Sequence, residues 1–162
     1  MTTETNPFAV IGCAVDRSAG SHAALRTAAV LARRLQAKLL LLHVEPLEPG
    51  EGPFAPPGVV RRARPVEEQR WMQEAYELRG APVELERGSG RIASTLLSLV
   101  RRRHVDLLVI GSGATRPMSL AVASVAGAVL VSAPCPVLVV ATPPKADADS
   151  PKTHDLELAM PP

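Results

Sequence analysis

Two glycines and a serine in the second half of the chain have the spacing of a phosphate-binding turn. The apolar run from Asp106 to Ile110 leads directly into Gly111 and Gly113, and Ser124 follows at the start of a short apolar segment. Glycines let backbone N–H groups approach a phosphate closely, and a helix N-terminus favours negative charge. The pattern therefore predicts an anion site. The alternative is an ordinary strand-to-helix turn, with Ser124 as a simple helix cap.

Three other side chains that could take part in chemistry are better interpreted as structural. His43 stands alone at the end of an apolar run, where a structural hydrogen bond is a better interpretation than catalysis. Cys13 and Cys135 are the only cysteines, which excludes a disulfide framework and a cysteine-based metal site. They are expected at opposite ends of the sheet, unpaired and inert.

Alternating strand and helix patterns must position these residues. Short continuous apolar runs indicate strands that are buried on both faces, and apolar residues at helical spacing indicate helices between them. The expected strands are 8–15, 39–44, 82–85, 107–110 and 136–140, with 82–85 at a sheet edge because Pro82 cannot donate to a ladder. The expected helices begin at Ser18 or Ser21, span 66–78, run from Ile92 to Val100, and span 124–131.

This order predicts one α/β domain over residues 1–142. Strands that alternate with helices form βαβ units, which build an open, doubly wound parallel sheet with helices on both faces. Residues 46–65 are rich in proline and glycine and are expected to form a long exposed loop. Residues 143–162 are polar and proline-containing, and we expect a disordered tail.

Composition excludes several classes of partner. The formal charge of the 162 residues is +2, and the chain has one Trp, one Tyr and two Phe, so neither nucleic acid nor an anionic membrane is expected. No apolar run approaches the roughly 20 residues that span a bilayer, and no signal peptide pattern opens the chain. A cytoplasmic location is expected. The basic run 101–104 is interpreted as the solvated end of a helix.

Several motifs together resemble the universal stress protein family. Residues 10–25 (VIGCAVDRSAGSHAAL) resemble its first strand, acidic turn and first helix, and Leu41-Leu-His-Val44 resembles the end of its second strand. Residues 106–113 (DLLVIGSG) resemble its fourth strand and glycine loop. Ser124-Val125 followed by 133–140 (APCPVLVV) resembles its closing segment, and this match is the most specific. The resemblance covers about residues 8–141 and implies a Rossmann-like sheet of order 3-2-1-4-5.

That strand order implies a place for a ligand. Connections diverge between strands 1 and 4, so a crevice opens beyond their carboxyl ends, where Asp16 and Gly111 lie. The resemblance implies that Asp16 contacts ribose hydroxyls or a metal-bound phosphate, and that Val44 offers backbone groups to adenine. It also implies that the phosphates are wrapped by Gly111, Gly113, Ser124 and Val125. A capping carboxylate is the alternative for Asp16.

The chain departs twice from the glycine pattern of the ATP-binding members, in which two residues separate the first glycines and nine precede the third. One residue separates Gly111 from Gly113, and Ala123 stands where the third glycine would be. We therefore expect adenine-nucleotide binding, with ATP and Mg²⁺ as the candidates, to be weak or altered.

Three functions remain open from the sequence. The first is a nucleotide-dependent stress regulator, and the second is a dimeric interaction protein whose nucleotide site has decayed. A phosphate-transferring enzyme is the least supported, because no Walker lysine, oriented general base or metal cluster is visible. The resemblance implies a homodimer through the last strand, Val137, Leu138, Val139 and Val140, whose apolar edge needs a cover.

Overall fold

The computed structural model describes residues 6–46, 65–112 and 125–142. The predicted proline-rich loop, the C-terminal tail, Gly113, Ala123 and Ser124 therefore fall wholly or largely outside the described residues. Nine elements are described: β1 (Val10–Ala14), α1 (Ala19–Arg34), β2 (Lys38–Glu45), α2 (Pro65–Arg79), β3 (Glu84–Ser89), α3 (Ile92–Arg102), β4 (Leu107–Gly111), α4 (Val125–Ser132) and β5 (Val137–Val140).

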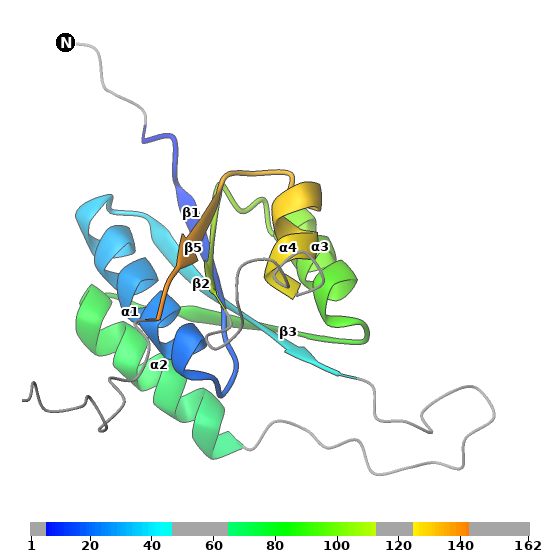
Figure 1. Ribbon diagram of the computed structural model, residues 1–162. Coiled ribbons are helices and arrows are strands. Elements are labelled where there is room, and N and C mark those ends of the chain that lie inside the picture. The colour runs from blue at the N-terminus through cyan, green and yellow to red at the C-terminus, as the bar shows by residue number, and fades with distance from the viewer. Residues whose placement is uncertain (1–5, 47–64, 113–124, 143–162) are drawn as a thin grey trace, which may run out of the picture.

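The strands form one parallel sheet in the order β3-β2-β1-β4-β5 (Figure 1). This confirms the expected α/β fold and its strand order. The connections from β1 lead to one side of the sheet and those into β4 and β5 to the other, so the order reverses between β1 and β4. At that reversal the carboxyl ends of two neighbouring strands are left without a crossing connection, which is where open α/β sheets bind ligands.

The sheet separates two apolar clusters. Helices α1 and α2 cover one face, and α3 and α4 cover the other (Figure 1). In β2, Leu39 and Leu41 pack against the α1–α2 side, while Leu40 and Leu42 pack against the α3–α4 side. Successive side chains of a strand point to opposite faces. Both faces are buried, and this explains why the strands read as continuous apolar runs.

Helix α1 begins where its serines allow it. Ser18 is the N-cap, and its Oγ accepts a hydrogen bond from the Ser21 N–H at 3.1 Å. The buried side of the helix carries Ala24, Ala28 and Ala32, all fully buried. These small side chains let α1 lie close to the sheet, so its N-terminus reaches the carboxyl ends of β1 and β4.

The third strand differs from the expectation. It runs from Glu84 to Ser89 rather than over 82–85, because its pairing with β2 continues to the pair Glu45–Ser89. Gly88, expected in a turn, is inside the strand: a Cβ there would lie 2.5 Å from Thr95 Cγ2, so its lack of a side chain makes room for α3. The expected edge position is confirmed.

The basic run at the end of α3 is paired with the neighbouring edge strand. The helix ends at Arg102 as expected, but Arg102 Nη2 lies 2.6 Å from Glu86 Oε1 and Arg103 Nη1 lies 2.6 Å from Glu86 Oε2. Arg103 also contacts the Glu84 carboxylate. The basic run therefore forms ion pairs with carboxylates of β3 and is not simply a solvated helix end. Among the described residues, no helix has the length and apolar character needed to cross a bilayer.

Candidate functional site

A pocket of about 290 Å³ opens where β1 and β4 end. It lies between the N-terminal turns of α1, α3 and α4, on the side of the sheet that Leu42 and Val44 face. Its walls are mainly apolar, with hydroxyl groups and one carboxylate at the rim. The lining residues are Ala14, Val15, Asp16, Ser18, Ser21, Leu42, Val44, Ile92, Leu96, Ile110, Gly111, Ser112, Val125 and Ala126.

Asp16 stands in a turn that ties β1 to α1. Its N–H donates to Ser21 Oγ at 2.7 Å, and its Oδ1 accepts from the Ser18 N–H at 2.8 Å. Ser21 is 5% exposed, so this turn is anchored in the protein interior. Asp16 itself is exposed, and within the described residues its Oδ2 has no hydrogen-bond partner. Oδ1 therefore orders the turn, and Asp16 as a whole lines the pocket.

The backbone of Val44 is directed toward the pocket. In β2, Lys38 N–H donates to the Ala9 carbonyl and Leu42 O accepts from Val15 N–H, so the even-numbered residues present their backbone groups to β1. The ladder between β1 and β2 ends at the pair Ala14–Leu42. Val44 lies beyond that end, and its peptide groups therefore project past β1 into the crevice.

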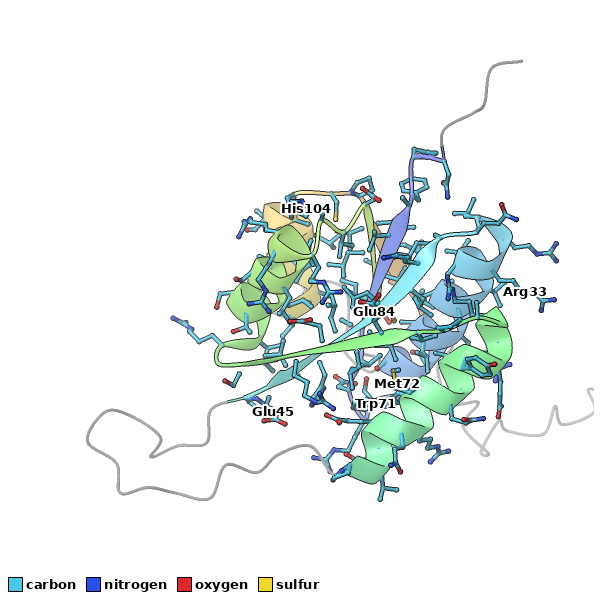
Figure 2. The ribbon with its side chains drawn as sticks, turned by 180° about the vertical axis from the view of Figure 1, so that it is seen from behind. Arg33, Glu45, Trp71, Met72, Glu84 and His104 are labelled. Atoms are coloured by element: carbon cyan, nitrogen blue, oxygen red, sulfur yellow. The ribbon has the colours of Figure 1, made fainter. Side chains whose placement is uncertain are left out.

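His43 holds the chain that leads to Asp16. Its Nδ1 lies 2.8 Å from the Val15 carbonyl oxygen, and because a carbonyl only accepts, Nδ1 carries the proton. On the same face its ring packs against Trp71, with 5.1 Å between ring centroids. Figure 2 shows Trp71 on α2. The interpretation of His43 as a structural hydrogen-bonder is consistent with this geometry.

Gly111 has a packing role that the sequence did not reveal. A Cβ at this position would lie 2.3 Å from the Gly20 carbonyl carbon, 2.4 Å from its oxygen and 2.8 Å from Ser21 N. All three are backbone atoms of α1, which cannot move as a side chain can. Gly111 thus lines the pocket, and it also lets the first turn of α1 lie directly on the end of β4.

Four of the seven expected site residues meet at this pocket: Asp16, Val44, Gly111 and Val125. Gly113, Ala123 and Ser124 lie outside the described residues, so their contribution stays a prediction. From the sequence, Ser21 was considered only as a helix cap and Ile92 only as part of a helix, but both line the pocket, and Ile92 is 40% exposed. The available signal was its place at the start of the expected helix that follows the third strand.

Among the described residues of this pocket, a divalent ion would find one carboxylate ligand. Asp16 is the sole acidic side chain among the described lining residues, and the described part of the chain contains no group of three or more His, Cys, Asp or Glu that could hold a metal. Mg²⁺ is commonly held by one or two carboxylates together with substrate phosphates and water. The donor set fits an ion that arrives with a nucleotide.

Both cysteines are free thiols, as expected. Burial raises the pKa of the Cys13 thiol far above its usual range, and burial is also the main cause of the raised pKa of Cys135. A thiol with a raised pKa is a poor nucleophile at neutral pH.

Comparisons with solved structures find the same fold. A universal stress protein in complex with cAMP is 20% identical to this chain. The match covers 82% of this chain and 96% of the other chain, with a TM-score of 0.60. A universal stress protein family member from Burkholderia pseudomallei is 25% identical over 84% of this chain and 98% of its own, with a TM-score of 0.63. A universal stress protein family protein from Arabidopsis thaliana with AMP bound is 19% identical. The match covers 82% of this chain and 90% of the Arabidopsis chain, with a TM-score of 0.54.

Comparison with protein-family models gives the assignment. No curated protein matches the chain significantly. Residues 7–141 match the universal stress protein family. This range includes every described helix and strand and the pocket between them. This chain belongs to the universal stress protein family.

Proposed function

We propose that this chain is a cytoplasmic regulatory module that binds an adenine nucleotide in the pocket at the ends of β1 and β4. The pocket itself carries the proposal: it is concave, largely apolar and lies at the reversal of strand order. Its volume of about 290 Å³ is at the lower end of small-molecule sites, which hold roughly 300–1,000 Å³. It suits a base and sugar, with the phosphates toward the open side.

The two halves of the pocket match the two halves of a nucleoside. Leu42, Ile92 and Leu96 form an apolar wall against which a planar base can pack. The backbone of Val44 can pair with the base edge, because it projects past the end of β1. Asp16 lines the pocket, and its Oδ2, which is not used in the turn, can accept hydrogen bonds from ribose hydroxyls.

The phosphate side of the site supports weak or altered binding. Ser112 N–H already donates to the Val140 carbonyl at 2.9 Å, and the N–H groups of Asp16, Ser18 and Ser21 are used within the turn. A polyphosphate would also lie near the Asp16 carboxylate, so bound Mg²⁺ would supply the charge that makes ATP acceptable there. Relatives crystallised with cAMP and AMP make mononucleotides equal candidates.

Calorimetric titration with ATP, ADP, AMP and cAMP, each with and without Mg²⁺, tests the proposal. The protein is purified natively, and bound nucleotide is extracted and identified. Saturable heat with any of these ligands, at a lower affinity in Asp16→Ala, supports the site. No heat with any ligand and no co-purified nucleotide would refute it.

A dimeric interaction protein without ligand is the second candidate, and one observation favours it. The outer edge of the sheet presents apolar side chains: Leu138 of β5 is 36% exposed, and Leu130 and Val131 of α4 are 53% and 85% exposed. An apolar sheet edge of this kind is normally paired or covered. A second copy, paired along Val137, Leu138, Val139 and Val140, would cover it. Sedimentation as a monomer at micromolar concentration would contradict the dimer.

A further inference from the structure

At the end of the β1–β2 ladder, next to the proposed site, one backbone hydrogen bond of regular parallel pairing is not formed. Lys38 N–H donates to the Ala9 carbonyl, and the same offset along the two strands places Val44 N–H opposite the Val15 carbonyl. A regular ladder would join that pair. Within the described residues, the Val15 carbonyl is taken instead by His43 Nδ1 at 2.8 Å, and no hydrogen bond joins it to Val44 N–H.

We propose that His43 is a positioning residue that keeps the adenine-recognition edge of the pocket open. Its imidazole takes the Val15 carbonyl and thereby stops the ladder one pair early, which leaves the Val44 peptide groups for a ligand. The inference rests on the nucleotide site proposed above. His43 itself does not line the pocket, because it points to the opposite face of β2 from Leu42 and Val44.

The same hydrogen bond fixes where Asp16 stands. Two hydrogen bonds hold Val15 to β2: its N–H donates to the Leu42 carbonyl at 2.9 Å, and its carbonyl accepts from His43 Nδ1. Asp16 follows directly and is held at its N–H by Ser21 Oγ. The chain carrying the carboxylate is therefore anchored to β2 before Asp16 and to α1 at Asp16. Without the imidazole, the Val15 carbonyl would pair with Val44 N–H instead, and the segment that carries Asp16 would be held in a different position.

Helix α2 keeps the imidazole in place. The Trp71 ring lies against it at an interplanar angle of 51°, and Trp71 is only 9% exposed. The neighbouring Glu68 is held by a hydrogen bond from Arg87 Nε at 2.6 Å. The ring is thus packed from α2, and its proton-bearing Nδ1 is directed at Val15.

The first test follows amide hydrogen exchange in the ligand-free protein. In His43→Leu the Val15 carbonyl loses its donor and becomes available to Val44 N–H, so the Val44 amide should exchange about 5-fold more slowly than in the wild type, the effect of one net hydrogen bond. His43→Asn retains a donor near the Nδ1 position and should restore wild-type exchange. His22→Asn, on α1, is the matched histidine control and should change nothing. Unchanged Val44 exchange in His43→Leu would overturn the proposal.

The second test measures AMP affinity by calorimetry. His43→Leu should bind AMP about 5-fold more weakly, while His43→Asn and His22→Asn bind as the wild type does. In the Asp16→Ala background the same substitution should cost less, because the two positions act on one turn. Equal losses in both backgrounds, or no loss, would overturn the positioning role. If the wild type binds no adenine nucleotide, the proposed function fails, and the exchange experiment still decides the role of His43.

Discussion

Replacing Gly111 with alanine separates a packing role for this glycine from a ligand-binding role. The added Cβ would lie 2.3 Å from the Gly20 carbonyl carbon, whereas ordinary contacts begin at 3.4 Å, so α1 or β4 must shift by about 1 Å. Both are central elements, and overpacking of this kind costs about 1–3 kcal/mol. Because the clash is with backbone atoms, we expect the upper end, about 3 kcal/mol, or a Tm about 6–12 °C lower for a chain of this size.

Urea and thermal unfolding of the ligand-free protein measure this effect, and Gly12→Ala is the matched control. A Cβ at Gly12 would meet the Val105 side chain at 3.0 Å and Leu42 Cδ1 at 3.2 Å. Those methyl groups can move by a few tenths of an ångström, so we expect a loss of about 1 kcal/mol. If Gly111→Ala is no more destabilising than Gly12→Ala, the absence of a side chain at Gly111 is not required for packing α1 on β4.

The remaining predictions concern the phosphate side, the sheet edge and acid stability. Ala123→Gly should strengthen ATP binding in calorimetry if the alanine methyl obstructs the phosphates; unchanged affinity would direct attention to the shortened glycine spacing instead. Leu138→Lys should shift the sedimentation of the protein to that of a monomer, since the side chain is 36% exposed at the sheet edge that a second copy would cover; a persisting dimer would place the interface elsewhere. The hydrogen bond from Arg87 lowers the pKa of Glu68 below its ordinary 4.5, so its stabilising effect is present above that pH and is lost as the pH falls through the lower folded-state value. Glu68→Gln should therefore flatten the decline in the free energy of unfolding below pH 4.5; an unaltered pH profile would show that this pair does not contribute.

Most of the fold could be read from local patterns. The continuous apolar runs indicated strands buried on both faces, and the observed strands β1, β2, β4 and β5 fall within a residue or two of the expected ranges. Ser18 was one of two expected caps and is the one used. The third strand was misplaced because Pro82 and Gly88 are local signals, whereas the strand's extent is set by its pairing with β2.

The location of the site was also predictable, but part of its construction was not. Asp16 and Gly111 both follow apolar runs, and parallel strands bring such ends to one edge of a sheet. The sequence gives no sign that Gly111 must admit the backbone of α1, since Gly20 lies far from it along the chain. It also gives no sign that the His43 side chain replaces a backbone donor to Val15.

The sequence by itself therefore determined the class of fold, the approximate ends of β1, β2, β4 and β5, and the residue types at the crevice. These follow from hydrophobic periodicity and from the capping and turn chemistry of single residues, which are local properties. The tertiary structure alone decided which groups are already engaged: Ser21 with Asp16, Gly111 with α1, and His43 with Val15. The reason is that a hydrogen bond or a close backbone contact between distant segments depends on register and helix position, and packing of the whole domain sets both.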